Sequence, residues 1–145
     1  MWLAMMLMAT RLLLFPGWET DFERARVTAK QEHKYILLNF SGSDWCGPCI
    51  RMHDEIFESP AFTQQAGTDL ILMNADFPRL KKNQLSAAQQ KQNEHLADLY
   101  NSRGNFPLTV LLTAEGKLLK EWVGVPEGGP EQFVREIKAA CHASH

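Results

Sequence analysis

The sequence contains few cysteines and no marked excess of charge, and both shortages exclude broad classes of protein. Only three of its 145 residues are cysteine, which is too few for a scaffold held by several disulfides and leaves one thiol unpaired. The net charge is −2, with 15 basic against 17 acidic residues. Because nucleic acids and acidic lipid surfaces attract strongly basic proteins, we expect neither as a partner.

A hydrophobic run long enough to cross a bilayer is also missing. The most apolar stretch, residues 1–15, is interrupted by Arg11 and is shorter than the roughly 18 residues that a membrane-spanning helix needs. It also lacks the basic start and small-residue cleavage site of a secretory signal. We interpret residues 1–17 as a degenerate or mis-started export signal, or as a terminal helix or strand that packs on the fold. No stable membrane insertion is expected.

We expect residues 18–145 to form one globular domain. The chain is 45% hydrophobic and 22% charged, and its length suffices to bury a core. Apolar periodicity predicts a helix over Trp18–Gln31 and a last helix from Pro130 in which Cys141 is buried. The turn residues of Thr113–Lys117 predict an antiparallel hairpin between two strands.

The most informative stretch carries two of the three cysteines. An apolar strand over residues 35–40 is followed by the turn residues Ser41–Asp44, then by Cys46 and Cys49, and then by a helical pattern that reaches Phe57. A cysteine at a helix N-terminus ionises readily because the unpaired backbone N–H groups and the helix dipole favour negative charge. The second cysteine, three residues on, faces the same side of the first turn and lies within reach of a disulfide.

The five residues Trp45-Cys46-Gly47-Pro48-Cys49 are identical to the active-site motif of thioredoxins. The sequence therefore resembles the thioredoxin-fold thiol:disulfide oxidoreductases. The letters FSGSDWC narrow the resemblance to thioredoxin-like thiol:disulfide interchange proteins of the bacterial envelope. A bare C-x-x-C would also suit a zinc site, but five matching residues directly after a buried strand are far more specific.

The resemblance implies an α/β fold with a central mixed β-sheet flanked by helices. A third-strand region over Leu70–Ala75 precedes the main departure, the polar stretch Arg79–Asn105, which is longer than the usual connection in the family. A stripe at near-helical spacing predicts an extra helix from about Ser86 to Ser102, inserted before the cis-proline strand, and its positions are Leu85, Ala88, Gln92, Leu96, Leu99 and Tyr100. This insertion is either additional scaffold or a partner-specific surface beside the active site.

A second landmark is the proline before the apolar run Leu108–Leu112. A proline can only begin such a strand or lie at its edge, because it donates no ladder hydrogen bond. The resemblance implies that Pro107 is a cis-proline facing the cysteines and that the preceding Phe106 flanks the disulfide. Gly124 matches a family glycine at the active-site surface, where the missing side chain lets a substrate backbone approach. Phe106 and Gly124 are therefore candidate substrate contacts.

Two positions depart from the family pattern. Thioredoxins bury an acidic residue with a lysine nearby behind the disulfide, and the matching residues here are Asn39 and Leu72. The buried acid and its lysine are both absent from this chain, so neither charge is buried without its partner. Proton transfer must then use water or another group. Asp44 is the nearest acid in the sequence, although a turn residue of this kind more often accepts backbone hydrogen bonds.

The resemblance implies the following chemistry. Cys46 is the nucleophile that forms a mixed disulfide with a substrate, and Cys49 resolves it. The Gly-Pro pair resembles strongly reducing members, for which thioredoxin itself has a potential near about −270 mV. We therefore expect a reductant without cofactor or metal. It would act on protein or small-molecule disulfides, draw on an upstream dithiol protein and reside in the periplasm or cell envelope, with the cytoplasm as the alternative.

Two other functions remain open from the sequence. One is a disulfide isomerase, which needs a stable reduced Cys46 and usually a dimer or peptide-binding cleft. The other is a redox-sensing or metal-binding module in which Cys46, Cys49 and His53 bind zinc or copper, since helical spacing brings His53 to the same face. Only three ligands are available in that arrangement, and Pro48 fits disulfide exchange better.

Overall fold

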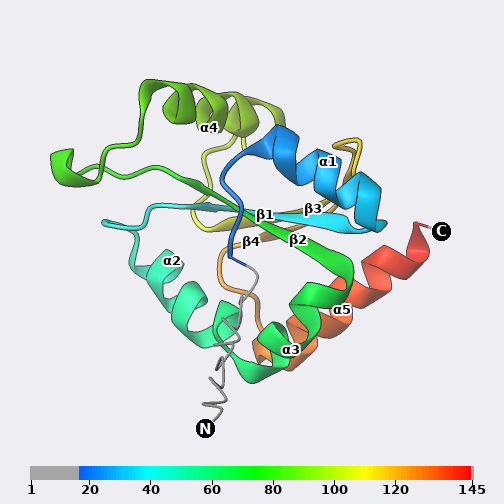
Figure 1. Cartoon of the computed structure of the whole chain (residues 1–145). Helices are drawn as coiled ribbons and strands as arrows, with labels where there is room; N and C mark the ends of the chain where they lie inside the picture. Colours follow the sequence, from blue (N-terminus) through cyan, green and yellow to red (C-terminus); the bar gives the residue numbers. More distant parts are fainter. Residues whose placement is uncertain (1–16, 145) are drawn as a thin grey trace, which may run out of the picture.

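A four-stranded mixed sheet forms the centre of the molecule (Figure 1). The computed structural model describes residues 17–144. The strands lie in the order β2-β1-β3-β4. Strand β1 pairs in parallel with β2 and antiparallel with β3, and β3 pairs antiparallel with β4. Their bounds are β1 (Tyr35–Ser41), β2 (Leu70–Asp76), β3 (Leu108–Leu112) and β4 (Leu118–Val123).

Helices cover both faces of the sheet. In Figure 1, α1 and α4 lie on one side, and α2, α3 and α5 lie on the other. The helical elements are α1 (Phe22–Glu32), α2 (Gly47–Met52), its π-helical continuation η1 (His53–Phe57), α3 (Pro60–Asp69), the short η2 (Lys81–Asn83), α4 (Ala87–Tyr100) and α5 (Gly129–Ala143). The expected α/β fold of thioredoxin-like type is confirmed.

The alternation of side chains along β1 divides the core in two. Leu37 packs with Met52 and Phe133 on the α2, α3 and α5 side. Ile36 and Leu38 pack on the α1 and α4 side, because successive residues of a strand point to opposite faces. A central strand covered on both faces is apolar along nearly its whole length, which explains the strand signal in the sequence.

The first helix begins at Phe22, so the expected start at Trp18 is wrong. Asp21 caps the helix by accepting the Arg24 backbone N–H at 3.0 Å. Before the cap the chain is extended, and the Glu19 backbone exchanges hydrogen bonds of 2.7 and 3.0 Å with Leu72 and Asn74 of β2. This pairing with a distant strand overrides the local helical pattern and brings Trp18 beside the sheet.

The extra helix α4 is confirmed and lies between β2 and β3. Its cap is Ser86, whose hydroxyl accepts the Gln89 N–H. The expected apolar stripe is only partly right: Leu96 is buried, whereas Ala88 and Leu99 are exposed. The side chain of Asn93 is buried instead and donates to the Asp76 carbonyl at 3.0 Å.

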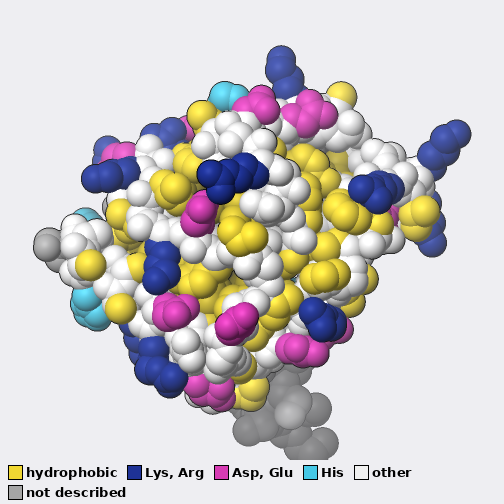
Figure 2. Space-filling model, turned by 180° about the vertical axis from the view of Figure 1, so that it is seen from behind, with side chains coloured by type: hydrophobic (Ala, Val, Ile, Leu, Met, Phe, Trp, Pro, Cys, Tyr) yellow, Lys and Arg dark blue, Asp and Glu magenta, His cyan; other side chains and the backbone are white. Residues whose placement is uncertain are grey.

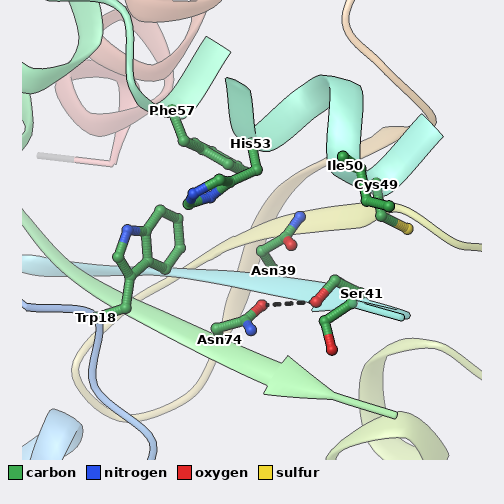
Figure 3. A pocket seen from close by; sticks show the side chains of 9 residues that line it. Trp18, Asn39, Ser41, Cys49, Ile50, His53, Phe57 and Asn74 are labelled. Atoms are coloured by element: carbon green, nitrogen blue, oxygen red, sulfur yellow. Dashed lines mark hydrogen bonds between the residues drawn. The ribbon is translucent and has the colours of Figure 1, made fainter. Parts of the chain in front are cut away.

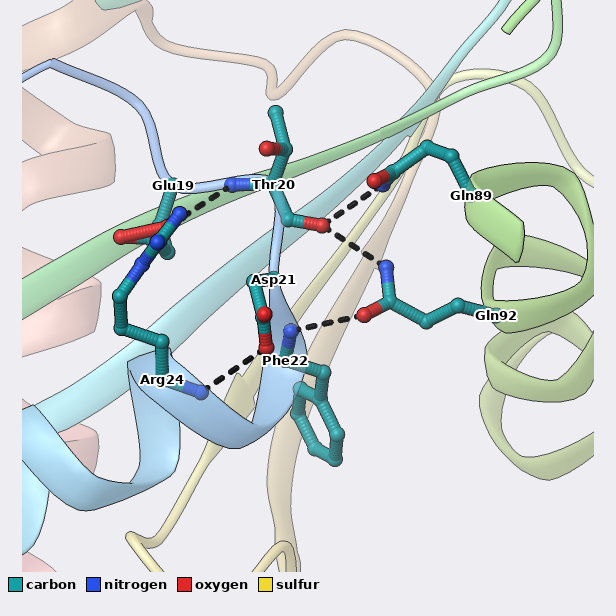
Figure 4. Close-up of polar contacts among 7 residues, drawn as sticks. All are labelled: Glu19, Thr20, Asp21, Phe22, Arg24, Gln89 and Gln92. Carbon is teal, nitrogen blue, oxygen red and sulfur yellow. Dashed lines mark hydrogen bonds and ion pairs between the residues drawn. The ribbon is translucent and has the colours of Figure 1, made fainter. Parts of the chain in front are cut away.

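Two glutamines of α4 attach the helix to the start of α1 (Figure 4). The amides of Gln89 and Gln92 both donate to the Thr20 carbonyl, at 2.7 and 2.8 Å. The side-chain oxygen of Gln92 accepts the Phe22 N–H at 2.9 Å, which is one of the donors that a helix start leaves without an intrahelical partner. These contacts give α4 a scaffold role.

The C-terminal half follows the expectation closely. The Thr113 N–H donates to the Lys117 carbonyl at 2.9 Å in the turn between β3 and β4. Helix α5 buries one stripe of side chains, which includes Phe133, Ile137 and Cys141. The predicted terminal segment, residues 1–17, lies outside the described residues except for Gly17. Within residues 17–144, no helix combines the length and the apolar character needed to cross a membrane.

Candidate active site

Cys46 and Cys49 lie at the N-terminus of α2 and form a disulfide, with their α-carbons 5.2 Å apart. Cys46 is the cap residue, and its sulfur accepts the Cys49 backbone N–H at 3.2 Å. The N-terminal position favours negative charge on the sulfur of Cys46 once the disulfide is reduced. Each cysteine is only 5% exposed, so the residues around the pair decide what reaches it.

The turn before the motif is shaped around Trp45. A β-carbon on Gly42 would overlap the indole ring, so glycine is the residue that fits there. The Cys46 N–H donates to the Gly42 carbonyl at 2.9 Å, and the indole Nε1 donates to the Phe77 carbonyl at 2.7 Å. Trp45 is thereby fixed on one side of the disulfide.

The predicted second landmark meets the motif in space. The Phe106–Pro107 peptide bond is cis, and the ring of Phe106 packs edge-on against Trp45 with centroids 5.4 Å apart. Gly124 has a φ of 75°, a backbone conformation that suits glycine, and its N–H donates to the Pro107 carbonyl at 2.9 Å. The fold thus brings together segments that lie far apart in the sequence. Their contacts with substrate stay a prediction.

Neutral groups occupy the two positions where thioredoxins carry a buried acid and its lysine. Asn39 is 5% exposed, and its amide donates to the Thr109 hydroxyl at 3.0 Å. Leu72 is buried among the apolar residues on the α2 side. The Asn39 side chain lines the same cavity as Cys49, which agrees with the position assigned to it from the sequence.

A cavity of about 420 Å³ lies behind Cys49 (Figure 3). In Figure 3, Cys49 is at one end, Trp18, His53 and Phe57 are at the other, and Asn39 lies between them. The Ser41 hydroxyl donates to the Asn74 side-chain oxygen at 3.1 Å. The lining residues are Trp18, Asn39, Ser41, Ser43, Cys49, Ile50, His53, Phe57 and Asn74, and they include neither a carboxylate nor a lysine.

Sequence reasoning names Asn39, Cys49 and His53 among the residues of this cavity and misses the others, of which Ser41, Asn74 and Trp18 are the most informative. Ser41 follows Asn39 by two positions in β1, so strand alternation could have placed both on one face. Asn74 is the register partner of Asn39 in the parallel pair, but that register comes from the folded sheet. The sequence predicts a helix at Trp18, and no local pattern indicates that its side chain reaches this cavity.

Asp44 acts as a cap for a distant loop and is not placed as a proton donor. Its carboxylate accepts the backbone N–H groups of Arg79 at 2.9 Å and Leu80 at 3.0 Å, and the Asn83 amide at 3.1 Å. The Arg79 N–H is the largest cause of a lowered Asp44 pKa, and the Leu80 and Asn83 donors add to it against partial desolvation. The carboxylate is therefore ionised at neutral pH.

The metal set suggested by the sequence is not assembled. Within residues 17–144, the potential ligand atoms that come within 4.8 Å of one another belong to His53, Asp54 and Glu58, all exposed, and include neither cysteine. The imidazole Nε2 of His53 lies 3.0 Å from the Glu58 carboxylate. Exposed acidic groups often gather in this way without an ion, so the cluster does not support a metal centre.

Cys141 is the remaining thiol and belongs to the core. It is 5% exposed on α5, and burial, with a smaller contribution from Asp69, raises its pKa to about 11. A thiol with this pKa stays protonated at neutral pH and is a poor nucleophile. The prediction that Cys141 is a small buried hydrophobe is confirmed.

A disulfide-bonded cysteine pair at a helix start, with a tryptophan directly before it and the residue next to a cis-proline packed on that tryptophan, on a mixed sheet covered by helices, defines a thioredoxin-fold thiol:disulfide oxidoreductase. The chain belongs to the thioredoxin-like family: the family model described as "Thioredoxin-like domain" matches residues 22–140. The sequence is 40% identical over 123 residues to the disulfide bond reductase DsbH of Chlamydia pneumoniae, covering 85% of this chain and 71% of that protein.

Solved structures agree with this assignment. A structure of the DsbH oxidoreductase superposes with a TM-score of 0.77 at 39% identity, covering 86% of this chain and 83% of that one. A disulphide isomerase from Xylella fastidiosa Temecula1 gives a TM-score of 0.60 at 18% identity, with coverage of 80% and 87%. The second likeness is one of fold alone, because the sequences have diverged too far to carry function.

Proposed function

We propose that this protein is a disulfide reductase in which Cys46 is the attacking thiolate and Cys49 resolves the mixed disulfide. The observation that carries the proposal is the cysteine pair at the N-terminus of α2, with Cys46 as the cap residue. The likeness to a disulfide bond reductase over 85% of the chain supports the reducing direction, as do Gly47 and Pro48 between the cysteines.

The reaction proceeds in two exchanges. The reduced Cys46 thiolate attacks one sulfur of a substrate disulfide, the substrate S–S bond breaks, and the departing substrate sulfur takes up a proton. Cys49, as thiolate, then attacks Cys46, which forms the protein disulfide and releases the second substrate thiol. Two electrons pass to the substrate in total. A second dithiol must then return the Cys46–Cys49 pair to its reduced form.

The second exchange requires Cys49 to lose its proton. Asn39 and Leu72 cannot accept one, but the cavity behind Cys49 has space and the polar groups of Asn39, Ser41 and Asn74 on its wall. A cavity of this size with several polar groups on its wall can hold water with several hydrogen-bond partners. We propose that water in this cavity takes the proton in place of the family's buried carboxylate.

The partners follow from the chemistry. Substrates are protein or small-molecule disulfides, and the electrons come from an upstream dithiol protein. We place the protein in the periplasm or cell envelope, on the basis of its likeness to a disulfide bond reductase and the interchange-type turn before Trp45. The candidate contacts Phe106 and Gly124 would meet the substrate, with Pro107 exposing backbone groups for an extended segment.

Variants of the two cysteines test the proposal. We expect the wild type to reduce insulin with dithiothreitol as electron source, Cys46→Ser to be inactive, and Cys49→Ser to accumulate a mixed disulfide on Cys46 that mass spectrometry detects. Cys141→Ser is the matched control and should reduce insulin at the wild-type rate. The assigned roles would be contradicted if Cys46→Ser formed a mixed disulfide on Cys49 as fast as Cys49→Ser forms one on Cys46.

A further inference from the structure

The segment that connects β2 to α4 is attached to the active-site turn. The Asp44 carboxylate binds the backbone N–H groups of Arg79 and Leu80, and the Trp45 indole donates to the Phe77 carbonyl. Asp44 and Trp45 are the two residues directly before Cys46. The start of the insertion therefore has a fixed position beside the reactive cysteine.

This attachment places one cation on the active-site tryptophan. The guanidinium carbon of Arg79 lies 3.7 Å from the centroid of the Trp45 ring. A planar guanidinium stacks well on an indole face, and the contact combines stacking with cation–π attraction. Arg79 is exposed and forms no ion pair with a carboxylate of residues 17–144, so its charge is free to meet a ligand.

The segment around Arg79 carries more basic than acidic side chains. Lys81 and Lys82 follow in η2 and are also exposed. Two carboxylates lie beside the segment, but Asp44 is directed at the backbone N–H groups of Arg79 and Leu80, and Asp76 at the backbone and hydroxyl of Ser43, so neither forms an ion pair with the Arg79 guanidinium. In Figure 2, dark-blue side chains gather at the projecting edge that corresponds to η2 in the reversed view.

We infer that Arg79 makes the active site select disulfide-bearing polypeptides with acidic residues beside the reacting cysteine. The inference rests on the proposed function. Trp45 directly precedes Cys46, so a substrate segment that reaches Cys46 and extends along Trp45 brings the residues next to the substrate cysteine within reach of the guanidinium. A carboxylate there can form a charge-assisted, bidentate hydrogen bond with it, whereas a lysine meets a like charge.

Two matched peptides test this inference. They carry the same intramolecular disulfide and differ only in having Glu or Lys beside each cysteine, and kcat/KM is measured for each with dithiothreitol as reductant. We expect the wild type to favour the Glu peptide about fivefold at low salt and to lose the preference at high salt, because exposed charges are screened there. Arg79→Gln should bring the ratio near one, and Arg79→Glu should reverse it.

Further variants separate charge from structure. Arg79→Lys keeps the charge but loses the planar stack, so we expect it to retain part of the preference. Arg135→Gln, at an exposed position on α5, is the matched control and should leave the ratio unchanged. Equal loss of activity toward both peptides in Arg79→Gln would mean that Arg79 only supports Trp45, and would overturn the inference. Failure of the wild type to reduce either peptide would instead contradict the proposed function.

Discussion

Replacing Asn39 with aspartate returns an acid to the position where thioredoxins bury one, but without the accompanying lysine. Asn39 is 5% exposed and its nearest polar partner is the Thr109 hydroxyl. Leu72 offers no positive charge. Burial disfavours the charged carboxylate, so we expect Asn39→Asp to have a pKa several units above the ordinary value of about 4.

The expected effect on stability follows from that shift. An acid whose pKa is raised in the folded state is neutral at low pH and destabilises progressively as the pH rises from about 4 toward its folded pKa. Each pKa unit corresponds to about 1.4 kcal/mol. A rise of about two to three units in the pKa of the new aspartate therefore lowers the free energy of unfolding by about 3 to 4 kcal/mol at pH 7. Urea unfolding of the oxidised protein at pH 4 and pH 7 measures this difference.

The same variant should speed the resolving step. A carboxylate in the cavity behind Cys49 can accept the Cys49 proton, directly or through water, so we expect the mixed disulfide on Cys46 to be resolved faster than in the wild type near pH 7. Asn93→Asp is a matched control: Asn93 is also buried, at 1% exposure, but lies on α4. It should destabilise without changing the resolution rate. A loss of stability in Asn39→Asp that is the same at pH 4 and pH 7 would refute the reasoning.

The remaining predictions concern Cys141, Gly42 and Asp44. Iodoacetamide at pH 7.5 should label Cys46 in the native reduced protein and leave Cys141 unmodified by mass spectrometry, because the pKa of Cys141 is about 11. For the same reason the protein should lose stability as the pH rises above about 9, where the thiol ionises only in the unfolded chain. Gly42→Ala should lower the free energy of unfolding by about 1 to 3 kcal/mol and change Trp45 fluorescence, because the added methyl overlaps the indole; unchanged fluorescence would contradict the packing. Asp44→Asn should speed amide hydrogen exchange at Arg79 and Leu80 because the amide is a weaker acceptor than the carboxylate. The wild type should show the same change only once the pH falls below the ordinary carboxyl pKa of about 4 and through the lowered pKa of Asp44, where the carboxylate takes up a proton. Unchanged exchange in Asp44→Asn would show that other contacts fix the segment.

Local patterns account for the parts of the fold that could be predicted. The strand before the motif, the turn and the helix start are each specified by neighbouring residues, so the positions of Cys46 and Cys49 followed from the sequence. The hairpin at residues 113–117 and the apolar stripe of α5 were predictable for the same reason. The resemblance then linked Pro107 and Gly124 to the motif, which no local pattern could do.

The features that escaped prediction depend on contacts between distant segments. Trp18 left its expected helix because the Glu19 backbone pairs with β2. On α4, Asn93 is buried and its amide reaches the Asp76 carbonyl, whereas Leu99 is exposed, and neither position could be read from the apolar spacing alone. The stacking of Arg79 on Trp45 joins residues 34 positions apart, and the polar stretch around Arg79 gave no hint of it.

The equilibrium redox potential of the Cys46–Cys49 pair tests the central claim most directly. It can be titrated against glutathione or dithiothreitol with Trp45 fluorescence as the signal. A reductase of this type predicts a value near about −270 mV. A redox potential above about −200 mV would contradict the account, because cysteine pairs with such oxidising potentials belong to proteins that form or isomerise disulfides.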